Sequence, residues 1–299
     1  MVPIRARDCS QARGGYATLR PIGAVNGVWC VAISQRLGFL GFGNMGSAIL
    51  RGLIDRNEIS PDLVAVYDPS DACRSEAAKL DVGIADNAGA LAVASDALVI
   101  AVKPQQFEEA IAPVADGLGE YDVVISIMAG VGISSIEKAL PSVARIARVM
   151  PNLPAVVGAG ASGIAYSSAC EGADRALVRT IFEAVGVVEE VEEGALDAVT
   201  AISGSGPAYF FHLVECMAAA GEAEGLDRAQ AERLAAQTAY GAGVMMHQSS
   251  ESPGTLRERV TSKGGTTFAA LEAFRENDLA GVVKSSVHAA ADRSRELGT

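Results

Sequence analysis

Two glycine-rich stretches carry the residues whose types and spacing could do chemistry. The first contains Gly41, Gly43 and Gly46, a G-x-G-x-x-G pattern between an apolar run and a helical pattern. In that setting Gly41 makes a tight turn, Gly43 lets the backbone approach a diphosphate, and Gly46 lets the helix pack on the strand. A diphosphate would lie at the helix N-terminus, where unpaired N–H groups and the helix dipole favour anions. The alternative is a strand-to-helix turn that binds nothing.

The acidic residue expected ~20 residues after such a turn is also present. The apolar run Leu63–Tyr67 ends at Asp68, which predicts a contact with the ribose of a dinucleotide. A carboxylate there would repel a 2′-phosphate and so favours NADH, whereas Arg74 could compensate and admit NADPH. The choice between the two cofactors therefore stays open.

The second stretch runs from Val260 to Thr267 and leads into a helical pattern of apolar residues. Gly264 and Gly265 expose backbone N–H groups with no side chains in the way, which predicts a binding nest for a small carboxylate. We expect Thr266 or Thr267 to cap the helix that follows. A capped turn without a ligand is the alternative.

Small or polar residues follow three more apolar runs. Ala101-Val-Lys-Pro104, Ala129-Gly130 and Met150-Pro-Asn152 each come directly after a predicted strand. In an open parallel sheet the ligand crevice lies outside the strands' carboxyl ends, so these residues suit a flat nicotinamide ring. Lys103 could contact the phosphates of the dinucleotide, or could simply help Pro104 to end the strand.

Conventional catalytic groups are scarce in the sequence. No lysine occurs between Lys138 and Lys263, there is no G-x-S-x-G motif, and the three histidines have no metal-binding spacing. The five cysteines are scattered and never form a C-x-x-C pair, which favours a reducing, cytoplasmic compartment and no zinc site. Reduction of a C=N bond fits this composition, because a protonated imine is already electrophilic and mainly needs positioning.

The elements that must position these residues alternate between apolar runs and helical patterns as far as about Glu193. The predicted strands are 37–40, 64–67, 97–102, 123–127, 146–149, 160–166 and 187–191. The predicted helices between them are 72–79, 88–94, 105–118, 134–140 and 174–185. This alternation is typical of an α/β fold with a doubly wound, Rossmann-type sheet.

Beyond Gly194 the strand patterns stop and alanine-rich helices follow. We expect helices over 207–220 and 228–247, and two more that begin near Thr267 and Ala280. Their apolar surface exceeds what about 105 residues can bury, which predicts an all-α C-terminal dimerisation domain. The alternative is that the helices close on their own Rossmann domain. The predicted division is a poorly ordered extension (1–34), a dinucleotide-binding domain (35–193) and a helical substrate-binding domain (194–299). The extension could be a transit peptide or the product of an upstream translation start.

The bulk properties restrict the partners. The chain has 299 residues and a formal net charge of −12, which disfavours nucleic acid and anionic membrane surfaces. No apolar run reaches the ~18 residues that a bilayer-spanning helix needs. An anionic substrate must therefore be held by a local device such as the Gly264-Gly265 nest.

At these motifs the sequence resembles the pyrroline-5-carboxylate reductases, over roughly residues 36–297. The stretches that carry the resemblance are Gly38–Gly46, Ala101–Pro104, Ala129-Gly130, Arg148–Asn152, Ser203–Tyr209 and Pro253–Thr267. The first is shared with many dehydrogenases, whereas the last two are specific to this family.

The resemblance implies NAD(P)H-dependent reduction of 1-pyrroline-5-carboxylate to L-proline by a homodimer or a larger ring of dimers. It implies that the substrate carboxylate binds the loop of Ser262, Lys263, Gly264, Gly265, Thr266 and Thr267, with the Thr267 hydroxyl near the ring nitrogen. It implies a cofactor site of Gly41, Gly43, Asn44, Met45, Gly46, Asp68, Asn87, Ala101, Val102, Lys103, Pro104, Ala129, Gly130 and Asn152.

Three positions depart from the family pattern. Met128 stands where a small residue is usual and is expected to narrow the nicotinamide pocket, and Leu153 replaces a common threonine. Lys263 replaces a frequent proline and either adds a positive charge near the carboxylate or faces solvent. The alternatives are a reductase of another cyclic imine, a β-hydroxyacid dehydrogenase, which the missing lysine disfavours, and a non-catalytic dinucleotide-sensing protein.

Overall fold

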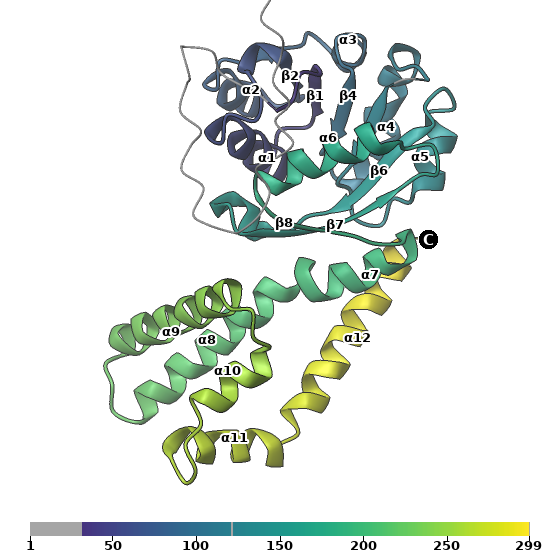
Figure 1. Cartoon of the computed structure of the whole chain (residues 1–299). Coiled ribbons are helices and arrows are strands. Elements are labelled where there is room, and N and C mark those ends of the chain that lie inside the picture. The colour runs from purple at the N-terminus through teal and green to yellow at the C-terminus, as the bar shows by residue number, and fades with distance from the viewer. Residues whose placement is uncertain (1–31, 121, 299) are drawn as a thin grey trace, which may run out of the picture.

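The computed structural model describes residues 32–120 and 122–298, so most of the predicted extension at 1–34 lies outside the described residues. Figure 1 shows two parts, a sheet region with helices on both faces and a helical region that follows it in the chain. This arrangement confirms the predicted fold class.

Within residues 32–120 and 122–298, eight strands form one sheet in the order β3-β2-β1-β4-β5-β6-β7-β8. They are β1 (Leu37–Leu40), β2 (Val64–Tyr67), β3 (Gly83–Ile84), β4 (Ala97–Ile100), β5 (Val123–Ser126), β6 (Arg145–Met150), β7 (Gly160–Tyr166) and β8 (Gly186–Glu190). The pairing is parallel throughout, except that β7 runs antiparallel to β6. The short edge strand β3 was not predicted from the sequence.

In the part of the chain that the structure describes, six helices cover the sheet. They are α1 (Asn44–Asp55), α2 (Asp71–Ala78), α3 (Ala88–Val93), α4 (Phe107–Ile111), α5 (Ile133–Ala139) and α6 (Gly172–Glu183). The single helix predicted over 105–118 is wrong, because α4 is flanked by 3₁₀ turns at Pro104–Gln106 and Ala112–Gly117. Pro113 explains the second turn, since proline lacks the N–H that would continue an α-helix.

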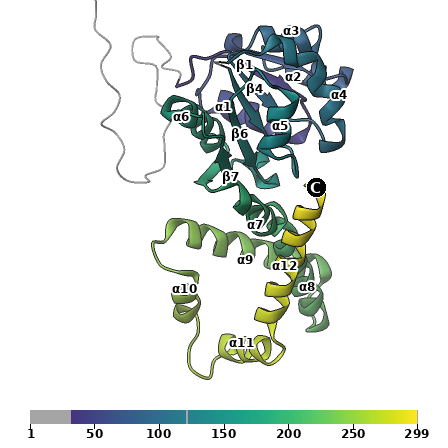
Figure 2. The same cartoon turned by 90° about the vertical axis from the view of Figure 1, so that its right-hand side faces the viewer.

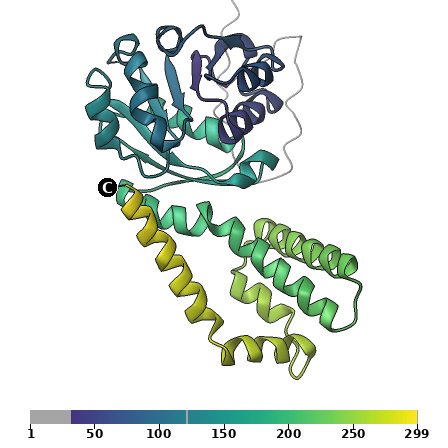
Figure 3. The same cartoon turned by 180° about the vertical axis from the view of Figure 1, so that it is seen from behind.

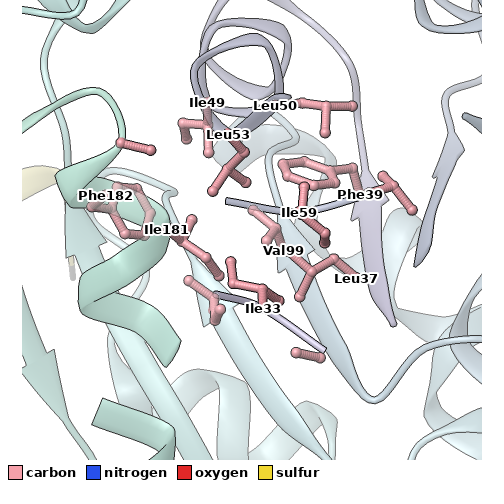
Figure 4. Close-up of a cluster of buried hydrophobic side chains, with 14 of the residues drawn as sticks. Ile33, Leu37, Phe39, Ile49, Leu50, Leu53, Ile59, Val99, Ile181 and Phe182 are labelled. Atoms are coloured by element: carbon pink, nitrogen blue, oxygen red, sulfur yellow. The ribbon is translucent and has the colours of Figure 1, made fainter. Parts of the chain in front are cut away.

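Two hydrophobic clusters hold these layers together, one on each face of the sheet. In Figure 4, Leu53 of α1 lies between Phe39 of β1 and Phe182 of α6, and the three belong to one cluster. The other cluster places side chains of α3, α4 and α5 against the opposite face. Both faces of the parallel strands are thereby buried, as their apolar sequences require.

The helical region contains α7 (Leu196–Val199), a π-helical turn (Thr200–Gly204), α8 (Gly206–Ala223), α9 (Arg228–Gln248), α10 (Pro253–Arg259), α11 (Thr266–Glu276) and α12 (Leu279–Leu297). α8 and α9 approach closely because Ala218 packs on Ala231 and Ala235. α10 was not predicted as a helix, although Ser252 caps it through a hydrogen bond from the Thr255 N–H.

α12 returns from α11 to the sheet region, whereas α11 lies at the opposite end of the helical region (Figures 1, 2 and 3). Ser294 of α12 donates a hydrogen bond of 2.6 Å to Asp197 of α7, which fixes this return. The helices leave large apolar side chains exposed, including Phe211 at 64% and Tyr240 at 67%. Exposed apolar surface on this scale marks an interface with another chain.

Within the residues that the structure describes, no helix combines the length and the apolar character needed to cross a membrane.

Candidate active site

The glycine turn after β1 is built as its spacing predicts. Gly41 has φ of +94°, and a Cβ there would lie 2.8 Å from the backbone oxygen of Ala101. A Cβ on Gly46 would lie 2.8 Å from the Gly41 oxygen, so α1 packs directly on the turn. By contrast, no heavy atom of the described residues lies within 4 Å of a Cβ built on Gly43. The fold needs two of these glycines, and the third leaves open space.

That open space lies at the N-terminus of α1. Gly43 is the N-cap residue, no side chain caps the helix, and Gly43 and Asn44 are exposed. The first N–H groups of α1 are therefore available to a ligand, and they carry the positive end of the helix dipole. The arrangement fits the diphosphate of a dinucleotide.

The carboxylate of Asp68 binds the backbone of two neighbouring turns. One oxygen accepts a hydrogen bond of 2.7 Å from the Phe42 N–H, and the other accepts one of 2.8 Å from the Ser70 N–H. Arg74 donates to the Asp68 backbone oxygen at 2.5 Å and forms an ion pair with Asp71. Asp68 thus stabilises the turn after β1 as well as standing at the end of β2.

The turns after β4 and β5 lie beside the glycine turn, because Leu40 pairs with Ile100 and Ile100 pairs with Ser126 in register. Lys103 and Ala129 are exposed there, and Ala101, Val102, Pro104 and Gly130 are half-buried. The structure therefore brings these predicted residues to one edge of the sheet.

Contacts that the sequence did not reveal hold the turn after β5. Glu193 accepts a hydrogen bond of 2.7 Å from the Ile133 N–H and one of 3.2 Å from Arg148. Gly130 has φ of +78°, and a Cβ there would lie 2.8 Å from the Leu297 oxygen at the end of α12. These partners are far apart in sequence, so spacing carried no signal for them.

The two predicted asparagines are placed differently. Asn87 is exposed and caps α3 through a 2.9 Å hydrogen bond from the Ala90 N–H. Asn152 is 8% exposed, and both ends of its carboxamide are hydrogen-bonded to the protein's own backbone.

The structure also shows where two of the residues that depart from the family pattern lie. Met128 is 2% exposed and belongs to a hydrophobic cluster, so the expectation that its side chain narrows the nicotinamide pocket is wrong. Leu153 is 53% exposed and lines an open hollow of about 600 Å³ between α1 and the 3₁₀ turn Leu153–Val157. Of the residues predicted to bind the cofactor, this hollow includes only Asn44.

The second glycine stretch forms a turn ahead of α11. Gly264 has φ of +72°, and the Gly265 N–H donates to the Ser262 oxygen at 3.0 Å. The N-cap of α11 is Gly265, with no capping side chain, so the expectation that Thr266 or Thr267 caps the helix is wrong. The N–H groups at the start of α11 are left for a ligand.

The chain does not bring its two glycine sites together. The loop 262–267 precedes α11, at the end of the helical region that lies away from the sheet (Figures 1 and 3). Within one copy of the chain, the two sites therefore lie at different ends of the structure.

No group of three or more potential metal ligands occurs among residues 32–120 and 122–298.

Comparisons with known proteins agree with this architecture. Residues 193–297 match the family described as pyrroline-5-carboxylate reductase dimerisation, and residues 36–130 match NADP oxidoreductase coenzyme F420-dependent. Pyrroline-5-carboxylate reductase of Synechocystis is 40% identical over 267 residues, which cover 89% of this chain and 99% of the relative. That of Methanosarcina acetivorans is 38% identical over 268 residues, which cover 89% and 98%.

Solved structures give the same result. The pyrroline-5-carboxylate reductase of Coxiella burnetii has a TM-score of 0.86 at 34% identity and covers 89% of this chain and 100% of its own. The Plasmodium falciparum pyrroline carboxylate reductase, solved with NADP bound, has a TM-score of 0.77 at 30% identity, with coverage of 89% and 99%. The chain has one uncapped helix N-terminus beside its Rossmann-type sheet and another in its helical region, and its relatives align along nearly their whole length. This chain therefore belongs to the pyrroline-5-carboxylate reductase family.

Proposed function

We propose that the chain reduces 1-pyrroline-5-carboxylate to L-proline, with NADPH or NADH as the hydride donor. The observation that carries this proposal is a pair of glycine turns, each leading into a helix with no capping side chain. One suits the diphosphate of a dinucleotide, and the other suits a small carboxylate. The names of the relatives supply the identity of the substrate.

The cofactor half of the site is assigned to the turns at the carboxyl ends of the parallel strands. Gly43, Asn44 and Met45 offer N–H groups to the diphosphate, and the open space beside Gly43 leaves room for it. The turns at 101–104 and 129–130 form the floor for the nicotinamide, which supplies a hydride when bound. Asp68 and Asn87 stand on the adenosine side.

The substrate half is assigned to the loop 262–267. The N–H groups of Thr266 and Thr267 are assigned to a carboxylate at the helix N-terminus, and Lys263 is exposed beside them. The Thr267 side chain is half-buried, and we assign its hydroxyl to hydrogen-bond the ring nitrogen of the substrate. These groups orient the imine, and its protonated form needs no further activation by the protein.

Each complete site is assigned to two copies of the chain. The loop 262–267 of one copy meets the cofactor edge of the sheet of another, and the exposed apolar side chains of α8 and α9 become buried in the interface. The separation of the two glycine turns in one chain supports this assembly (Figure 1). We further propose a division near residue 193 between a dinucleotide-binding domain and a helical domain. A cytoplasmic location is supported by the free thiols of Cys73, Cys170 and Cys216.

The direct test is oxidation of NADPH or NADH by the purified protein on addition of pyrroline-5-carboxylate, with proline identified as the product. Thr267→Val should lower kcat/KM by about tenfold or more, since a hydrogen bond to a charged group contributes ~1.5–3 kcal/mol. Thr238→Val is the matched control, because the Thr238 hydroxyl donates only to the Leu234 oxygen of its own helix. Dinucleotide binding without turnover would contradict the proposal and favour a sensing protein.

A further inference from the structure

Asn152 joins the sheet region to the helical region through a single buried side chain. The Ala161 N–H of β7 donates to its Oδ1 at 2.8 Å, and its Nδ2 donates to the Ser203 oxygen at 3.0 Å. Ser203 lies in the π-helical turn that leads into α8. The carboxamide therefore fixes the start of β7 and the start of α8 relative to the end of β6.

The Ser203 carbonyl needs a donor from outside its helix because of Pro207. In an α-helix this carbonyl would accept a hydrogen bond from the N–H of the residue four positions later. That residue is Pro207, which has no N–H. Nδ2 of Asn152 supplies the donor that the proline lacks.

The surrounding contacts make this junction specific. The Ser205 N–H donates to the Thr200 oxygen at 2.8 Å, which widens the helix by one residue at this point. Gly204 faces Met150, and a Cβ there would lie 2.8 Å from the Met150 Cε atom. The segment 150–152 thus contacts two successive residues of the turn, Ser203 and Gly204.

We propose that Asn152 is a positioning residue, which takes the place of the missing N–H of Pro207 and thereby sets the direction in which α8 leaves the sheet. α8 packs on α9 and leads on to α10 and α11, so its direction determines where the substrate loop meets the cofactor of the second copy. This inference rests on the proposed function. It replaces the sequence-based interpretation of Asn152 as a cofactor contact.

The test is a double-mutant cycle of Asn152→Ala and Pro207→Ala. Asn152→Ala should lower kcat/KM for pyrroline-5-carboxylate by about tenfold, mainly through KM, and leave the Kd of NADPH within about twofold of wild type. In the Pro207→Ala background a backbone N–H is available to the helix again, so the same change should lower kcat/KM by only about threefold or less.

Asn277→Ala is the matched control. Its Nδ2 also donates to a helix carbonyl, the Ala273 oxygen at 2.8 Å, but both groups belong to the end of α11. Its removal should leave kcat/KM within about twofold. Should Asn152→Ala alone fail to fold, the rescue is measured as recovery of folded protein in the Asn152→Ala/Pro207→Ala double variant, and no recovery would count against the inference.

Two results would overturn the inference. One is an increase in the Kd of NADPH that matches the fall in kcat/KM, which would make Asn152 a direct cofactor contact. The other is strict additivity of the two substitutions, both in kcat/KM and in the urea midpoint of unfolding. Because unfolding needs no substrate, the coupling is measured even if wild-type protein fails to turn over, and that failure would count against the proposed function alone.

Discussion

Replacement of Gly43 by alanine should separate binding of the dinucleotide from stability of the fold. Gly43 has φ of −72° and ψ of −164°, a conformation open to alanine, and no atom of the described residues lies within 4 Å of the added methyl group. The free energy of unfolding should therefore change by less than about 0.5 kcal/mol. The methyl group nevertheless enters the space where we place the diphosphate.

The expected loss of affinity follows from the hydrogen bonds at the start of α1. A phosphate oxygen that accepts from an N–H lies at ~2.9 Å, a distance that a methyl group beside the N–H prevents. Loss of one such bond to a charged group amounts to ~1.5–3 kcal/mol, so the Kd of NADPH should rise by about tenfold to 100-fold.

Gly46→Ala should instead lower the stability of the fold. Its Cβ would lie 2.8 Å from the Gly41 oxygen and 3.3 Å from the Ala101 Cβ, so α1 must shift away from β1. Overpacking of this kind destabilises a protein by ~1–3 kcal/mol, with or without a dinucleotide.

The assay combines urea unfolding, followed by circular dichroism, with titration of NADPH followed by its fluorescence. Gly172→Ala is the matched control, because Gly172 is the first residue of α6 and a Cβ there also meets nothing within 4 Å. It should alter neither stability nor binding. The reasoning is refuted if Gly43→Ala binds NADPH as tightly as wild type, or if it is less stable than Gly46→Ala.

Three further predictions concern groups outside the proposed catalytic contacts. Glu193→Ala leaves the buried Ile133 N–H without its acceptor and should lower the free energy of unfolding by ~1–3 kcal/mol, with a smaller loss for Glu193→Gln. The hydrogen bonds from Arg36 lower the pKa of Asp96, so this carboxylate stabilises the fold above its unfolded pKa of ~3.9 and loses its contribution as pH falls through the folded pKa. The stability difference between wild type and Asp96→Asn should therefore shrink from pH 7 to pH 3, and a constant difference in urea midpoint would argue against it. Burial raises the pKa of the Cys170 thiol, so iodoacetamide should alkylate it at least about tenfold faster in urea than in native protein, whereas equal rates would contradict its burial.

The sheet could be predicted from the sequence because its strands are buried on both faces and read as short apolar runs. The predicted bounds of the strands at 37–40, 64–67 and 160–166 agree with the structure residue for residue. The helix predicted over 105–118 failed because its apolar pattern outweighed Pro113, and β3 was missed because a strand of two exposed residues leaves no pattern.

The local parts of the candidate site could also be predicted, since Gly41 and Gly46 have roles set by their immediate neighbours. The contacts of Glu193 with Ile133, and of Asn152 with Ser203, could not. They join residues 60 and 51 positions apart, and only the folded chain brings these groups within hydrogen-bonding distance. Asn152 was correctly placed at a strand end, yet its hydrogen bonds turn toward the protein interior.

In the proposed assembly, the glycine turn of one copy and the substrate loop of another form one reaction site. A heterodimer of a Gly43→Asp chain and a Thr267→Val chain, purified through a different affinity tag on each, tests this arrangement. If each site is shared between the two copies, one of the two sites of the heterodimer combines an intact glycine turn with an intact loop. The heterodimer should then regain about half the wild-type rate of proline formation. If each chain carried a complete site, both sites of the heterodimer would be defective, and a rate no higher than that of either parent would rule out a shared site.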